Sequence, residues 1–156
     1  MATIQWFPGH MSKARRQVQE NLKFVDFVTV LVDARLPLSS QNPMLTKIVG
    51  DKPKLMILNK VDLADPVATK EWQDYFESQG IKTLAINSKE QSTVKKVTDA
   101  AKSLMADKIA RQKERGIQIE TLRTMIIGIP NAGKSTLMNR LAGKKIAVDR
   151  KSTRLN

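Results

Sequence analysis

Short apolar runs alternate along the chain with longer segments in which apolar residues recur at helical spacing. Four runs are rich in aliphatic and β-branched side chains and are typical of strands buried on both faces, at residues 24–32, 54–58, 83–86 and 122–127. Strands that alternate with helices in this way predict an α/β fold with a parallel sheet and helices on both faces. The loops at the carboxyl ends of the strands are then expected to form the binding crevice.

The helical segments carry recognisable start and stop signals. Ser12 is expected to cap a basic amphipathic helix, and Asn42-Pro43 to open a brief helix that stops at Gly50. Asp65 and Pro66 begin a helix that ends at Gly80 and is expected to bury Trp72, Tyr75 and Phe76. One long amphipathic helix is predicted from about residue 93 to the charged turn at 113–116, and a last one follows residue 133 to about 142.

The turn between the fourth strand and the last helix has the spacing G-x-x-x-x-G-K-S over residues 128–135. Glycines at both ends let backbone N–H groups point inward at an anion, and the helix adds the positive end of its dipole. Lys134 would contact the β- and γ-phosphates, and the Ser135 hydroxyl would ligate Mg²⁺. We therefore predict a phosphate-binding loop whose nucleotide contacts are Gly128, Asn131, Ala132, Gly133, Lys134, Ser135 and Thr136.

A second motif, Asn59-Lys60-Val61-Asp62, follows the strand at 54–58 and matches N-K-x-D. The Asp62 carboxylate can accept from the ring N–H and the exocyclic amine of guanine, a donor pair that adenine lacks on that edge. Asn59 would tie this loop to the phosphate loop, and the alkyl stem of Lys60 would lie over the base. Asn87 and Ser88 follow the next strand, where a backbone N–H could contact the guanine oxygen. The hypothesis is GTP binding, and an ATP-using phosphate-loop protein is the less favoured alternative.

The excess of basic residues in the composition points to a polyanionic partner. The 156 residues hold 27 Lys and Arg against 15 Asp and Glu, a formal charge of +12. Such an excess favours nucleic acid or an anionic membrane. Basic residues recur on the first helix, the long helix and the end of the chain, which favours an RNA-binding surface over an ordinary solvated face. They are Lys13, Arg15, Arg16, Lys95, Lys96, Lys102, Lys108, Arg111, Lys113, Arg115, Arg140, Lys144, Lys145, Arg150, Lys151 and Arg154.

Other features of the sequence bear on the compartment of the protein and on its association with membranes. The chain has no cysteine, which fits a reducing compartment, and it shows neither a signal segment nor a run apolar enough for a membrane span. We therefore expect a soluble cytoplasmic protein of one domain, without a membrane partner and monomeric.

The guanine motif precedes the phosphate loop, an order opposite to that of most GTPases. With Trp6-Phe7-Pro8-Gly9-His10-Met11, Asp33-Ala34-Arg35, Asn59-Lys60-Val61-Asp62 and residues 128–135 in this order, the chain resembles the ribosome biogenesis GTPase A family of circularly permuted, YlqF-type GTPases. The resemblance runs to about residue 147. It implies a permuted, P-loop NTPase-like G domain at residues 1–147 that binds GTP and Mg²⁺. It also implies a cytoplasmic role in maturation of the large ribosomal subunit precursor through rRNA.

The resemblance also raises expectations about catalysis. It places His10 near the nucleotide, where a neutral imidazole could orient the attacking water, although the turn at residues 6–9 could instead be a packing element that leaves His10 to cap the next helix. Asp33 and Arg35 could line the pocket or simply end a buried strand. Of the switch threonine segment that the family carries after the phosphate loop, the chain keeps at most Asp149-Arg150, and the D-x-x-G motif is absent from the sequence. We therefore expect a G domain incomplete at its carboxyl end, with residues 148–156 as a basic tail whose sequence need not be native.

The missing motifs leave the activity open. GTP hydrolysis is expected of the full-length family protein, and it is doubtful for this chain alone. The alternative function is a non-hydrolysing RNA-binding assembly module in which the nucleotide only holds the loops in place.

Overall fold

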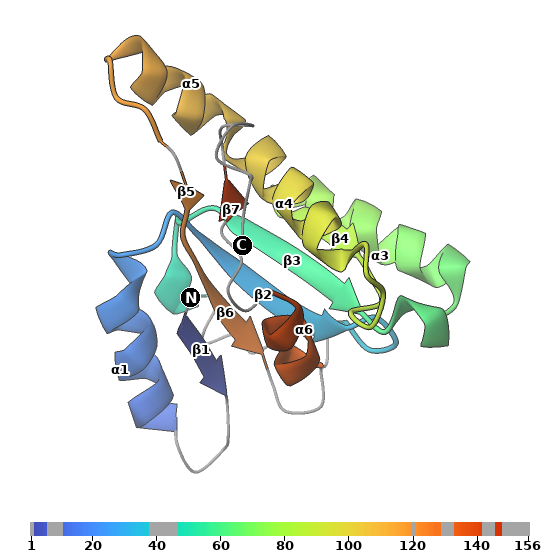
Figure 1. Ribbon diagram of the computed structural model, residues 1–156. Coiled ribbons are helices and arrows are strands. Elements are labelled where there is room, and N and C mark those ends of the chain that lie inside the picture. The colour runs from blue at the N-terminus through green and yellow to red at the C-terminus, as the bar shows by residue number, and fades with distance from the viewer. Residues whose placement is uncertain are drawn as a thin grey trace.

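The computed structural model describes residues 2–5, 11–37, 47–119, 121–128, 133–141 and 146–147. For residues 2–5, 11, 12, 14, 134, 135, 138, 146 and 147 only the backbone is described. The described residues form three layers, with a parallel sheet between two layers of helices (Figure 1). Within them, no helix is both long and apolar enough to cross a bilayer.

The central sheet has five strands in the order β1-β6-β2-β3-β4, and every pairing is parallel. Its strands are β1 (Ala2–Gln5), β2 (Phe27–Asp33), β3 (Lys54–Asn59), β4 (Lys82–Ala85) and β6 (Thr124–Gly128). Two short strands, β5 (Thr121–Leu122) and β7 (Ile146–Ala147), pair antiparallel beside it. The predicted α/β class is confirmed.

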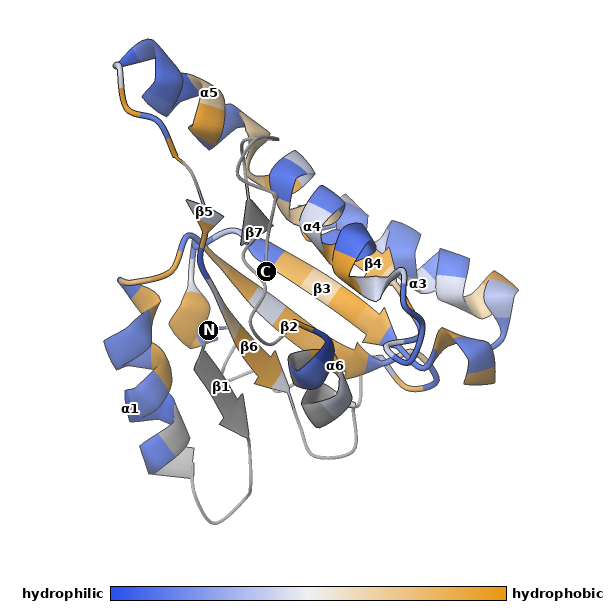
Figure 2. Ribbon diagram, in the orientation of Figure 1, coloured by the Kyte–Doolittle hydropathy of each residue, from blue (hydrophilic) through white to orange (hydrophobic). Residues whose placement is uncertain are grey.

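Alternate residues of the buried strands face opposite helical layers. On one face Leu31, Ile57 and Ile126 pack with α4 (Thr93–Leu104) and α6 (Lys134–Leu141). On the other face, one cluster joins Val28 and Met125 to Val18 of α1 (Met11–Leu22), and a second joins Val32, Met56 and Leu58 to Phe76 of α3 (Pro66–Ser78). Because both faces are covered, β2, β3 and β6 are apolar almost throughout, as Figure 2 shows.

Local signals set the ends of α3 where the sequence predicts them, whereas α1 begins at Met11, so that the predicted cap Ser12 lies within the helix. The Asp65 side chain accepts a hydrogen bond of 3.1 Å from the Val67 N–H, with Pro66 as the first residue of α3. Gly50, Gly80 and Gly116 lie just beyond helical segments and have φ between 60° and 81°, a left-handed conformation that glycine adopts without strain. Residues 47–49 are helical, and the predicted beginning of that helix at Asn42-Pro43 lies outside the described residues.

Several predicted elements are corrected by the structure. The sheet has five strands rather than four, because the short segment β1 pairs with β6 from far along the chain. The first predicted strand begins only at Phe27, since residues before it turn and Phe24 is 60% exposed. Tyr75, predicted to be buried, is 46% exposed, whereas Phe76 is 2% exposed and Trp72 is partly buried.

Two predicted elements are divided in the structure. The long helix is α4 followed by α5 (Ala106–Glu114), with Met105 between them in a non-helical conformation and buried in the core. The apolar spacing continues across this break, so periodicity alone predicts one helix. The predicted strand at 122–127 is divided at Arg123, where β5 leaves the main sheet and β6 begins.

Candidate nucleotide-binding site

The predicted site residues converge at the carboxyl ends of the parallel strands. In the register of the sheet Asp33 of β2 lies beside Asn59 of β3, and Leu31 lies beside Gly128 of β6. The residue after β4, Ile86, donates its N–H to the Leu58 carbonyl at 2.9 Å and so carries Asn87 and Ser88 to the same edge. Parallel strands therefore bring four loops together where α/β sheets ordinarily bind ligands.

Asn59 lies at the centre of this edge and is 1% exposed. Its Oδ1 accepts a 2.9 Å hydrogen bond from the Ser88 N–H, and its backbone carbonyl accepts one of 2.7 Å from the Ala34 N–H. A buried amide with such partners fixes the loops after β2, β3 and β4 relative to one another. The predicted tie to the phosphate loop depends on the position of Gly133.

Gly133 precedes α6 and approaches Asn59 closely. Its φ is +87°, and a Cβ placed there would lie far inside van der Waals contact with Nδ2 of Asn59 and 3.7 Å from Oγ of Ser88. Both the backbone conformation and the lack of space therefore require glycine. The predicted proximity of Asn59 to the phosphate loop is present in the structure, and Ser88 lies beside the same glycine.

The N-K-x-D residues after Asn59 form a tight turn. Lys60 is left-handed, with φ 62° and ψ 36°, and is followed by the 3-10 helix η2 (Val61–Leu63), which leaves Asp62 exposed. The Val61 N–H donates to the Ile86 carbonyl at 3.1 Å, so the turn is attached to the strand end beside it. Asp62 is therefore presented to solvent from an anchored turn.

Asp33 and Arg35 form an ion pair next to this turn. Nε and Nη2 of Arg35 donate to the two carboxylate oxygens of Asp33 at 3.0 and 2.7 Å, and Nζ of Lys60 lies 3.8 Å from Oδ2. The hydrogen bonds from Arg35 are the largest cause that lowers the pKa of Asp33 below its ordinary 3.8, while burial opposes them and Lys60 adds a smaller effect. Asp33 therefore stays ionised and lies close to the lysine of the N-K-x-D motif.

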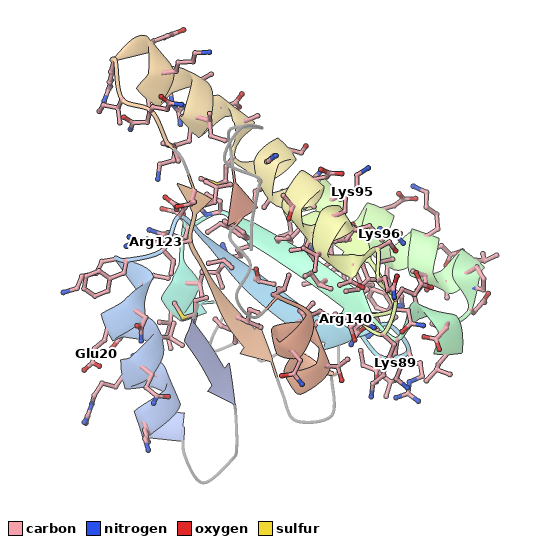
Figure 3. All side chains as sticks on the ribbon, in the orientation of Figure 1. Glu20, Lys89, Lys95, Lys96, Arg123 and Arg140 are labelled. Carbon is pink, nitrogen blue, oxygen red and sulfur yellow. The ribbon has the colours of Figure 1, made fainter. Side chains whose placement is uncertain are left out.

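Arg140 is a site residue whose position the sequence does not reveal, since the spacing of charges places it only among the basic surface residues. It projects from α6 toward the loop after β4, near Lys89 (Figure 3). Its Nε donates to the Ser88 carbonyl at 3.3 Å, and its Nη2 donates to the Lys89 carbonyl. The helix that follows the phosphate loop is thus hydrogen-bonded directly to the Asn87–Ser88 loop.

The Asn87–Ser88 loop has its own internal bonds. Oδ1 of Asn87 accepts from the Lys89 N–H at 3.1 Å, and Oγ1 of Thr93 donates to the Asn87 carbonyl at the same distance. Because the Ser88 N–H is directed at Asn59 and the Lys89 N–H at Asn87, neither points freely at a ligand. This loop is held rigidly at the strand edge.

Other predicted site residues are described only in part. His10, Asn131 and Ala132 lie outside the described residues, as do the tail residues 148–156. Lys134 and Ser135 are the first two residues of α6, with only their backbone described, and Thr136 is half-buried in the same turn. The predicted start of the helix at the end of the phosphate loop is confirmed.

Fold and site together define a nucleotide-binding α/β protein of the phosphate-loop class, with an N-K-x-D turn at the same sheet edge. The sequence model of a family described as 50S ribosome-binding GTPase matches residues 123–154. Ribosome biogenesis GTPase A of Bacillus pumilus is 54% identical over 145 residues, which are 93% of this chain and 51% of that protein. The chain belongs to the ribosome biogenesis GTPase A family.

More distant relatives carry related names. Mitochondrial ribosome-associated GTPase 1 of Bos taurus is 38% identical over 138 residues, 88% of this chain and 41% of that protein. The crystal structure of GNP-bound YlqF from T. maritima has a TM-score of 0.58 at 31% identity, covering 85% of this chain and 48% of that one. The chain spans about half the length of the curated relatives it matches.

Proposed function

We propose that this chain binds GTP at the carboxyl edge of its sheet. The observation that carries the proposal is the convergence at Asn59, whose side chain accepts from Ser88 and lies against Gly133. One buried amide thereby joins the N-K-x-D turn, the following loop and the phosphate loop. A guanine nucleotide needs a turn that recognises the base and a loop that binds the phosphates at the same edge of the sheet.

In the proposed complex the phosphate loop holds the phosphates through backbone N–H groups and the start of α6. Lys134 supplies a positive charge to the β- and γ-phosphates, and the Ser135 hydroxyl is the protein ligand of Mg²⁺. This donor set fits Mg²⁺, because the ion keeps several waters and takes phosphate oxygens in addition to one or two protein ligands. The remaining contacts come from Gly128, Asn131, Ala132, Gly133 and Thr136.

Guanine is read from the neighbouring turn. Asp62 is exposed and projects from an anchored 3-10 helix, which suits a carboxylate that accepts from two donors on the base edge. The aliphatic stem of Lys60 covers the base. The ion pair of Asp33 and Arg35 lies next to the ammonium group of Lys60. Asn87 and Ser88 complete the pocket wall, with Arg140 as their support.

We further propose that the protein acts in assembly of the large ribosomal subunit in the cytoplasm and binds rRNA. The names of its relatives, ribosome biogenesis GTPase A and mitochondrial ribosome-associated GTPase 1, support this role. The order of its motifs supports a circularly permuted G domain over residues 1–147. GTP hydrolysis with His10 orienting the water is the proposed activity of the longer family protein.

A second candidate is a non-hydrolysing RNA-binding module in which nucleotide holds the loops. The formal charge of +12 favours it, because a basic surface suits a polyanionic partner. Measuring phosphate release from GTP separates the two, because only a GTPase produces it.

Replacing Asp62 with Asn tests guanine recognition. Asn offers one acceptor and one donor in place of two acceptor oxygens, so it suits xanthine, which has a carbonyl where guanine has its amine. We expect Asp62→Asn to weaken GDP binding by about 100-fold, the order of one lost hydrogen bond to a charged group with two donors left facing each other, and to strengthen binding of xanthosine diphosphate. Titration calorimetry with both nucleotides measures this exchange.

Two outcomes count against guanine recognition by Asp62. Unchanged GDP affinity in Asp62→Asn would show that another group reads the base. Equal affinity of the unaltered chain for ADP and GDP would favour the ATP-using alternative. Asp74→Asn is a matched control, because Asp74 lies on the exposed surface of α3 and pairs only with Lys70 among the described residues.

A further inference from the structure

A polar cleft of about 470 Å³ lies at the opposite end of the sheet from the nucleotide site. It is lined by residues directly before three neighbouring strands: Asp26 before β2, Lys52 near the start of β3, and Arg123 before β6. Lys23 and Phe24 enter from the turn after α1, and Lys108 from α5. In Figure 3 Arg123 lies at the other end of β6 from Arg140 and Lys89. A seven-residue strand such as β2 separates the two sites by about 20 Å.

The described charge of this cleft is predominantly positive. Asp26 is its one described acid, and its oxygens are already engaged by Nζ of Lys108 at 3.3 Å and the Arg123 N–H at 2.7 Å. Among the described residues, no ion pair involves Lys23, Lys52 or the Arg123 guanidinium. Glu120 lies outside the described residues. The cleft therefore presents three cations to a ligand with negative charge.

An exposed aromatic ring adjoins these cations. Phe24 is 60% exposed, and Nζ of Lys23 lies 5.2 Å from the centre of its ring. The turn after α1 holds Phe24 outward, with its N–H bonded to the Asn21 carbonyl at 3.0 Å. Aromatic rings beside a basic groove are the usual platforms on which unpaired bases stack.

We infer that this cleft binds a segment of single-stranded RNA, with phosphates on Lys23, Lys52 and Arg123 and a base against Phe24. The inference rests on the proposed function, which supplies RNA as the partner. A recess of this volume suits a nucleotide-sized group. An acidic peptide or an anionic membrane would use the cations without needing the ring, whereas an unpaired base stacks on it. The combination of cations, recess and exposed ring thus favours RNA.

The test compares two charge reversals of equal size. Lys52→Glu with Arg123→Glu changes the cleft, and Lys47→Glu with Lys70→Glu changes, by the same net charge, two exposed lysines outside both the cleft and the basic surface predicted from the sequence. Binding of a fluorescein-labelled oligouridylate is followed by anisotropy over a salt series. We expect the cleft pair to lose about tenfold or more in affinity, and its salt slope to fall by about 0.7 for each lost phosphate contact. The control pair should lose much less.

Phe24→Ala tests the stacking contact separately. We expect about a fivefold or greater loss of oligouridylate affinity with an unchanged salt slope, since no charge is removed. Polyglutamate at matched charge serves as competitor, and anionic vesicles as a second probe. Effective competition by polyglutamate together with no effect of Phe24→Ala would overturn the inference in favour of an acidic protein, and vesicle binding lost only in the cleft pair would point to a membrane.

GDP titration of every variant separates failure of the inference from failure of the proposed function. The cleft variants should keep GDP affinity, because their residues lie at the far end of the sheet. Equal losses of oligouridylate affinity in the cleft and control pairs would overturn the assignment of RNA binding to the cleft but leave RNA binding itself intact. No oligouridylate binding by the unaltered chain would overturn both the cleft and the RNA part of the proposed function, while GDP binding would still stand.

Discussion

At the scale of single residues, the site depends on one close approach. Gly133 has no room for a side chain because Asn59 occupies the space that a Cβ would need. Asn59 in turn is held in place by the Ser88 N–H, since a buried amide without partners would be costly. The glycine of the phosphate loop is therefore fixed by packing against the guanine turn as well as by its own φ.

Gly133→Ala tests this approach. The left-handed conformation costs alanine about 1 kcal/mol, and the steric conflict with Asn59 adds about 1–3 kcal/mol of overpacking. We expect a loss of unfolding free energy greater than the first figure alone, measured by urea denaturation, and strongly reduced GDP binding.

Gly80→Ala is the matched control for this substitution. Gly80 has a φ of +81°, but a Cβ at this position would have no other atom within 4 Å. It should therefore show the conformational cost alone, with GDP affinity unchanged. Equal destabilisation by the two substitutions would mean that Asn59 moves aside without cost.

At the scale of elements, α6 and the loop after β4 behave as one unit. Arg140 extends from the helix and donates to the carbonyls of Ser88 and Lys89. Leu137 and Leu141 on the same helix are buried against the sheet. The helix thus links the end of the phosphate loop to the position of the Asn87–Ser88 loop.

Arg140→Lys keeps the charge and removes the planar, two-point donation. We expect GDP affinity to fall about fivefold, which corresponds to about 1 kcal/mol for a partly exposed hydrogen-bonded link. Fluorescence titration with a labelled GDP measures it. Lys89→Ala is the control, because Lys89 contributes its main-chain carbonyl, and an equal loss in both variants would contradict the argument.

At the scale of the whole molecule, the first strand, β1, places β6 in the interior of the main sheet. β1 pairs with β6 through the register Ala2 to Met125 and Gln5 to Gly128, so β6 lies inside the sheet rather than at its edge. An interior strand has hydrogen bonds on both sides, which fixes the start of the phosphate loop more firmly than an edge strand would.

Deleting residues 2–5 tests this contribution. β6 would become an edge with unpaired backbone groups, so we expect a loss of about 2 kcal/mol in unfolding free energy and greater light scattering on standing. A variant with alanine at positions 3, 4 and 5, next to the native Ala2, retains the backbone pairing and should be less affected. If both variants matched the unaltered chain, β1 would contribute little to stability.

Much of the fold follows from local sequence. Buried strands and capped helices are predictable because their apolar spacing and end signals, such as Asp65 with Pro66, act within a few residues. β1 is too short for such a pattern, and its pairing depends on β6, which lies far along the chain. Met105 interrupts a helix without interrupting its apolar spacing, since it remains buried in the same core.

The sequence by itself determined the G-x-x-x-x-G-K-S loop, the N-K-x-D turn and the parallel sheet that places both at one edge. The tertiary structure decided how they touch, through Asn59 against Gly133 and Arg140 against the Ser88 carbonyl. It also brought Lys52 and Arg123 together with the exposed ring of Phe24 in one cleft. Motifs are local in the chain, whereas contacts between residues far apart in the chain exist only once the strands are in register.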